Sequence, residues 1–235
     1  MKNQYFGDRR DYFKYGLLEA LAEGVPGIGR LTCIWMQTPN VFNGDGQRPF
    51  VANASFNRLA AFLTECRSRG TRDIRVMRDY FGGRAYAYYP YGANPDEIFA
   101  MGRRAAYFDR VPDEALTDAI VFFDPDNGLE PASAVSAAHL RYEELRSVFI
   151  RMDRSSIAVV YQHLPRVRAD LFWPAVASRV ARHLGTPVTY VTDRDVSFYV
   201  IPRMVGALPT IRDILDRVVE TGLARRADAW APPLQ

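Results

Sequence analysis

Apolar runs alternate along the chain with segments whose apolar positions recur at helical spacing. Residues 8–22 carry apolar side chains three and four positions apart, which predicts an amphipathic helix. Continuous apolar runs predict buried strands in three segments: 30–38, 117–124 and 155–165. The aromatic segment 83–92 also reads as a strand, whereas 72–81 is ambiguous. Further helices are predicted over 54–70, 94–109, 139–152, 168–185 (with a kink at its internal proline) and 210–224. This alternation predicts an open, mostly parallel α/β sheet of the Rossmann-like class.

The last strands differ from the earlier ones. Residues 186–203 hold two apolar runs around the polar tetrapeptide "TDRD", which predicts an antiparallel hairpin near the C-terminal end of the sheet. A chain of 235 residues without repeats predicts one domain, with a loop insertion at 38–53 and an irregular tail at 225–235.

Polar side chains follow three of the predicted strands. Ligands of open α/β sheets lie at the carboxyl ends of the strands, so these tips are candidate site residues. They are Thr38–Asn40, Asp124–Asn127 and Gln162–His163. Asp124 and Asp126 lie close enough to repel each other, and such a pair needs a cation, a hydrogen-bond donor or a shared proton. His163 is a candidate general base or metal ligand.

Composition narrows the function classes. Two cysteines are too few for a disulfide framework or a thiolate metal site, and no apolar stretch reaches the length of a membrane span. The first residues lack the order of a secretory signal, so we expect a cytoplasmic protein without membrane association. The net charge of +3 rests almost wholly on arginine, which suits contact with a phosphate-rich partner. Lys2 and Lys14 are the only lysines, and Lys14 shares a helix face with Asp11.

Three motifs, in order, resemble one family. They are "FGDRRDYFKYGLL" (6–18), "VFFDPDNGLE" (121–130) and the strand "VSFYVIPR" (196–203) followed by an amphipathic helix. Bacterial large-subunit rRNA adenine-N6 methyltransferases have similar motifs in the same order, including a D-P-P-Y motif in the middle of the sequence. The protein is also similar to uncharacterised bacterial proteins that share the words KYGLL, DPDNGLE and YQH.

The resemblance implies an S-adenosylmethionine-methyltransferase-type fold, which requires the terminal hairpin. It implies S-adenosylmethionine as cofactor and nucleic acid as partner, with RNA expected ahead of DNA. A partner protein is a separate expectation. Asp124 would accept a hydrogen bond from the amine of a target adenine. The residues assigned to catalysis are Asp124, Asp126, Asn127 and His163. Those assigned to the cofactor are Asp11, Lys14, Tyr15, Thr38 and Asn40.

Two other functions fit the same motifs. The acids could serve a metal-dependent nuclease or phosphohydrolase, because Mg²⁺ and Mn²⁺ prefer oxygen ligands. The ligands would then be Asp124, Asp126, Glu130 and His163. Alternatively, the protein is a catalytically silent Rossmann-like binding module that works with a partner, since the loop after the first strand lacks the compact glycine turn of a cofactor site.

Overall fold

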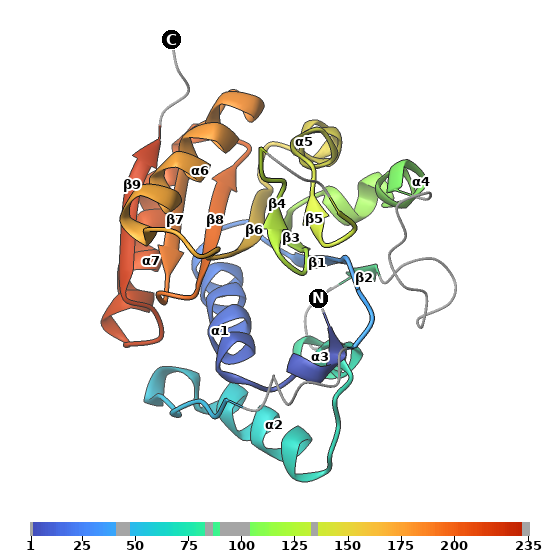
Figure 1. The fold of residues 1–235 in the computed structure, drawn as a ribbon, viewed down its shortest axis with the longest axis vertical. Helices are drawn as coiled ribbons and strands as arrows, with labels where there is room; N and C mark the ends of the chain where they lie inside the picture. The colour runs from blue at the N-terminus through green and yellow to red at the C-terminus, as the bar shows by residue number, and fades with distance from the viewer. Residues whose placement is uncertain (1, 41–47, 83–86, 90–103, 133–135, 232–235) are drawn as a thin grey trace.

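The structure is a computed structural model that describes residues 2–40, 48–82, 87–89, 104–132 and 136–231. Its centre is a seven-stranded sheet with the strand order β2-β1-β3-β6-β8-β7-β9 (Figure 1). The strands of this sheet are β1 (Arg30–Trp35), β2 (Ala87–Tyr89), β3 (Ala119–Asp124), β6 (Ile157–His163), β7 (Val188–Thr192), β8 (Val196–Pro202) and β9 (Arg226–Ala231). A separate two-stranded sheet pairs β4 (Gly128–Leu129) with β5 (His139–Leu140).

The sheet is parallel in one half and antiparallel in the other. Strand β1 runs parallel to both β2 and β3, and β3 runs parallel to β6. Strand β8 is antiparallel to both β6 and β7, so the hairpin predicted around "TDRD" is confirmed. The α/β class and the mostly parallel sheet closed by an antiparallel hairpin are therefore confirmed.

Helices cover both faces of the sheet. They are α1 (Arg9–Gly24), α2 (Asn57–Ser68), α3 (Met77–Phe81), α4 (Arg104–Asp109), α5 (Tyr142–Arg151), α6 (Ala169–Leu184) and α7 (Leu208–Glu220). One apolar core joins α1, α2, α3 and α7 to the sheet, and a second core joins α4, α5 and α6 to it. Side chains alternate between the faces of a strand, so Phe122 of β3 enters the first core and Phe123 the second. This double coverage explains why the strand sequences are continuously apolar.

Two predicted segments differ from the structure. The tail predicted to be irregular contains β9, an edge strand antiparallel to β7. Its sequence, "RADAWA", shows no apolar run, and its pairing partner lies far away in the chain. The helix predicted from residue 139 begins only at Tyr142, because His139 and Leu140 pair with the strand that follows the acidic turn.

Other predictions fall partly outside the described residues. Residues 83–86, 90–103 and 41–47 are not described, so β2 and α4 represent only parts of the predicted 83–92 strand and 94–109 helix. Within the predicted loop insertion, residues 38–40 and 48–53 form neither helix nor strand. The ambiguous segment 72–81 is helical. None of the helices in the described ranges is long and apolar enough to cross a membrane.

Candidate functional site

The sheet brings the predicted strand tips to one edge. Trp35, the last residue of β1, pairs with Asp124, the last residue of β3, and the amide N–H of Met36 donates to the Asp124 carbonyl at 3.2 Å. Strand β6 lies beside β3 and ends at His163. The polar residues after these strands therefore gather at the carboxyl edge, as the parallel pattern predicts.

Helix α1 delivers the opening motif to this edge. The side chain of Asp8 caps the helix by accepting from the backbone N–H groups of Arg10 and Asp11. The carboxylate of Asp11 also accepts from the N–H of Gly7 at 3.0 Å. These bonds fix the first turn, and they place Lys14 one turn further along the helix, under the tip of β3.

Lys14 lies between two carboxylates in the interior. Its Nζ is 2.8 Å from Oδ1 of Asp11 and 2.9 Å from Oδ2 of Asp124, and all three side chains are at most 3% exposed. Burial lowers the pKa of Lys14, but the two carboxylates outweigh it and hold that pKa well above its ordinary value. Burial raises the pKa of Asp11 to about 6, although Lys14 opposes the shift. Lys14 thus remains protonated and fixes the orientation of the Asp124 carboxylate.

Asp126 faces the other lysine of the protein. Its Oδ2 accepts hydrogen bonds from Lys2 Nζ at 2.5 Å and from Thr38 Oγ1 at 2.9 Å. Burial raises its pKa, but nearby positive charge and these two bonds outweigh burial and leave that pKa below its ordinary value. The adjacent acids therefore each have a lysine donor, which relieves the repulsion expected between them.

The four predicted metal ligands are not gathered in one place. Asp124 and Asp126 line one cavity, whereas Glu130 lines another and accepts from the N–H of Tyr142 at 2.8 Å. Within the described residues, no group of three or more histidine, cysteine, aspartate or glutamate side chains could hold a metal ion. The chain turns between β3 and β4, and Glu130 beyond that turn contacts the N-terminal end of α5 instead of the acidic cavity.

The first cavity, which we call the acidic cavity, has a volume of about 110 Å³. Its lining comprises Lys2, Tyr5, Asp8, Arg10, Asp11, Lys14, Asp124, Pro125, Asp126, Asn127, Tyr161 and His163. Of these described residues four are acidic, and three besides His163 are lysine or arginine, so the cavity has one excess negative charge when these seven are ionised and His163 is neutral. Lys2, Asp8 and Arg10 were not predicted as site residues, although all three lie in or beside the opening motif.

Three residues assigned to the cofactor, Tyr15, Thr38 and Asn40, do not line the acidic cavity. Thr38 is connected to it by the hydrogen bond that its hydroxyl donates to Asp126. Tyr15 is fully buried in the core on the α1 face, with its ring centroid 5.3 Å from Lys14 Nζ. Asn40 is exposed, and its side-chain oxygen accepts from the N–H of Gln4 at 3.2 Å. Tyr15 was assigned to the cofactor because it flanks Lys14, and its helical spacing also indicates a core position, where the structure places it.

A second pocket of about 310 Å³ lies beside the acidic cavity, and we call it the aromatic pocket. Its lining comprises Asn127, Leu129, Glu130, Pro131, His139, Tyr142, Gln162, His163, Pro165, Phe172, Val176 and Arg179. Asn127 and His163 line both spaces, so they form the boundary between them.

Gln162 holds the acidic turn in place at this boundary. Its carboxamide accepts from the N–H of Leu129 at 2.8 Å and donates to the carbonyls of Asn127 and His163 at 3.2 and 2.9 Å. Gly128 has a φ of +105°, and a Cβ there would lie 2.5 Å from the Gln162 carboxamide. The glycine is therefore required both by the backbone angle and by the close approach of Gln162.

His163 is half-buried, and its Nδ1 is buried without a hydrogen-bond partner among the described residues. Burial and the charge of Arg10 lower its pKa, whereas nearby carboxylates oppose the shift. The imidazole is consequently neutral near pH 7 and able to accept a proton.

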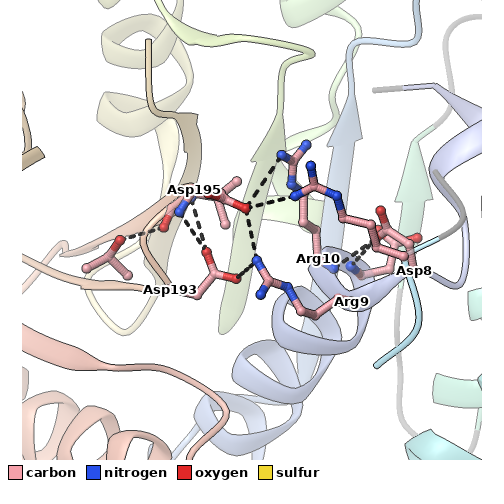
Figure 2. Close-up of polar contacts among 9 residues, drawn as sticks. Asp8, Arg9, Arg10, Asp193 and Asp195 are labelled. Carbon is pink, nitrogen blue, oxygen red and sulfur yellow. Dashed lines mark hydrogen bonds and ion pairs between the residues drawn. The ribbon is translucent and has the colours of Figure 1, made fainter. Parts of the chain in front are cut away.

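The "TDRD" hairpin contributes a charged cluster next to His163. Figure 2 shows Asp195 among arginine side chains: its Oδ2 lies 2.9 Å from Arg9 Nη2 and 3.2 Å from Arg48 Nη1. Asp193 is 3.2 Å from the same Arg9 nitrogen, and its other oxygen accepts from two N–H groups of the hairpin. These ion pairs attach the start of α1 to the hairpin and help to fix the wall of the acidic cavity.

Comparison with known proteins does not assign the protein to a family. No protein-family model matches the sequence, and no curated protein matches it.

Proposed function

We propose that the protein is a methyltransferase that uses S-adenosylmethionine and acts on an amino group of nucleic acid, with adenine in RNA as the expected target. The observation that carries the proposal is the 2.9 Å contact between Lys14 and Asp124, because it joins the opening motif to the central acidic motif at the carboxyl edge of the sheet. The antiparallel hairpin of β7 and β8, which the methyltransferase fold requires, also supports it.

The acidic cavity fits part of such a cofactor. S-adenosylmethionine carries a cationic sulfonium and an amino group, and the negative excess of the cavity is complementary to them. Its volume of about 110 Å³ is below the roughly 300–1,000 Å³ of pockets that bury whole ligands. It therefore suits the charged end alone, which Asp126 would hold, oriented by the hydrogen bond from Thr38.

When bound, S-adenosylmethionine supplies an electrophilic methyl group. A ring amine is a poor nucleophile, because its lone pair is delocalised into the ring. The Asp124 carboxylate would accept one N–H of the amine and so favour the geometry in which the lone pair is available. Lys14, which is itself protonated, orients that carboxylate through the 2.9 Å contact.

The reaction must also remove a proton from the amine. The cofactor would supply the methyl group, with its sulfur as the leaving group, and the methylated nitrogen would lose one proton. His163 is neutral near pH 7 and lies at the edge of the same cavity, so it is the candidate base that takes this proton.

Calorimetric titration with S-adenosylmethionine tests the cofactor. Transfer of a labelled methyl group to RNA and DNA then tests the reaction. We expect Asp124→Asn to bind the cofactor and lose methyl transfer. Asp113→Asn is the matched control, because Asp113 is exposed and pairs with Arg151 away from the site. Folded wild-type protein that binds no cofactor at millimolar concentration would refute the proposal.

One observation favours a second candidate, the catalytically silent binding module. Asp124 and Asp126 already have lysine partners, and the contacts of Asp11, Lys14 and Asp124 resemble a buried structural cross-link. This candidate predicts that the protein binds no S-adenosylmethionine and that Asp124→Asn changes only stability.

A further inference from the structure

The hairpin between β7 and β8 lies against three arginine side chains, Arg9, Arg10 and Arg48, which we call the arginine cluster. Two of them bind one oxygen of Asp195: Arg9 Nη2 lies 2.9 Å and Arg48 Nη1 3.2 Å from its Oδ2. The Nη2 atom of Arg10 faces the same oxygen at 4.0 Å (Figure 2). Three positive groups from two parts of the chain therefore converge on one carboxylate.

The two hairpin aspartates have different roles. The Asp193 carboxylate accepts from the N–H groups of Asp195 and Val196 at 3.1 and 3.2 Å, so it belongs to the turn itself. Among the residues that the structure describes, the Asp195 carboxylate accepts hydrogen bonds only from the arginine cluster. Its backbone carbonyl is held by the N–H of Leu164 at 2.9 Å. The Asp195 side chain can therefore turn away from the cluster without breaking a hydrogen bond of the hairpin.

Asp195 satisfies the arginine cluster only in part. Arg10 stays beyond hydrogen-bond distance, and its side chain donates to none of the residues that the structure describes. The three arginine side chains are 26–68% exposed, so a solute can reach them. Ion pairs at such exposure contribute little to stability, so folding alone does not explain why these like charges gather. A phosphate group presents more oxygen acceptors than a carboxylate, and planar guanidinium groups bind those oxygens in pairs.

We propose that the arginine cluster binds a phosphate group and that the Asp195 carboxylate takes the place of that group while the site is free. Arg10 lines the acidic cavity, so the bound phosphate would lie beside that cavity. The N–H of Arg9 donates to the carbonyl of Arg48 at 3.1 Å, which holds Arg48 beside helix α1. The inference goes beyond the proposed function, because phosphate binding requires neither the cofactor nor methyl transfer.

Isothermal titration calorimetry of the protein with inorganic phosphate, at constant ionic strength set with chloride, tests the site. Asp195→Asn removes the competing charge, so we expect it to bind phosphate about threefold more tightly than wild type, which is the scale of an exposed ion pair. Arg10→Gln should weaken binding about tenfold, because it removes a hydrogen bond between charged groups. A merely structural cluster predicts neither effect.

Two matched controls separate these effects from general changes in charge. Asp113→Asn also removes one negative charge, but Asp113 is exposed and pairs with Arg151 outside the arginine cluster. Arg69→Gln also removes one positive charge, but Arg69 is 72% exposed and pairs with Glu65 on α2. Both controls should bind phosphate like wild type.

A single-stranded oligouridylate and its uncharged methylphosphonate analogue identify the source of the phosphate. Uridylate lacks the adenine of the proposed target, so its binding reports on the backbone. If oligouridylate binds more tightly than inorganic phosphate, and the analogue and Arg10→Gln abolish this gain, the site takes a phosphodiester of nucleic acid. Tighter binding of inorganic phosphate assigns the site to a free phosphate, and either source supports the inference.

Three results would overturn the inference. They are phosphate binding no stronger than that of chloride, wild-type affinity in Arg10→Gln, and an affinity of Asp195→Asn no higher than that of Asp113→Asn. Phosphate binding without binding of S-adenosylmethionine refutes the proposed function alone, and the reverse refutes the phosphate site alone.

Discussion

Replacing Lys14 with methionine tests whether the buried charges of the site are balanced as the structure indicates. Methionine is of similar length and apolar, so the change removes the charge and leaves most of the packing. Asp11 and Asp124, which are 2% and 1% exposed, would then be buried without a counter-charge. Removing one partner of a buried ion pair typically costs about 3–5 kcal/mol. This is a large part of the roughly 5–15 kcal/mol that stabilises a typical domain.

Urea denaturation followed by tryptophan fluorescence measures this loss, because Trp35 and Trp173 are both buried. Protonated carboxyl groups need no counter-charge, so the stability deficit of Lys14→Met should shrink as the pH falls. Lys2→Met is the control: Lys2 also faces a carboxylate at 2.5 Å, but its side chain is 16% exposed, and we expect a loss of about 1 kcal/mol. Adding Asp124→Asn to Lys14→Met should restore part of the stability.

A loss below about 1 kcal/mol for Lys14→Met at neutral pH would contradict this reasoning. So would a deficit that does not change with pH, because a simple packing defect has no reason to depend on protonation. Either result would mean that water or movement of the helix relieves the two carboxylates.

Three further predictions concern the same edge. Asp11 has a folded pKa of about 6 against 3.8 when unfolded, so the unfolding free energy should fall by up to about 3 kcal/mol as the pH rises from about 4 to about 6. Asp11→Asn should flatten that slope in pH-dependent urea titrations. Gly128→Ala should cost about 2 kcal/mol or more, because the new Cβ meets Gln162. Gly185→Ala, at a φ of +66° with open space around it, should cost only about 1 kcal/mol, and equal losses would refute the clash. Arg194 has a φ of +89°, so Arg194→Gly should raise the unfolding free energy by about 0.5–1 kcal/mol, and a lower melting temperature would contradict the strain.

The pattern of apolar and polar positions along the sequence was sufficient to predict most of the fold. The continuous apolar runs predicted β1, β3 and β6, because strands covered on both faces have no polar alternation. The "TDRD" tetrapeptide predicted the β7–β8 hairpin, because its polar turn residues separate two short apolar runs. The edge strand β9 was missed because its pairing with β7 is a long-range contact, and such contacts leave no local pattern in the sequence.

The site was predicted less completely, because its contacts join residues far apart in the chain. The rule that ligands lie at the carboxyl ends of parallel strands placed Thr38, Asp124 and His163 correctly at one edge. Nothing local in the sequence indicates that Lys2 pairs with Asp126, 124 positions away. Tyr15, which was assigned to the cofactor because it lies next to Lys14, is buried in the core on the α1 face.

The turn after β3 explains why the short motif 121–130 lines both the acidic cavity and the aromatic pocket. Three hydrogen bonds of Gln162 hold the turn against the end of β6, and Gly128 allows this close approach. Asp126 is consequently directed to the acidic cavity, whereas Glu130 lies in the aromatic pocket. Asp126 and Glu130 therefore line different spaces as long as Gln162 keeps these bonds. The same turn places Asn127 on the lining of both the acidic cavity and the aromatic pocket.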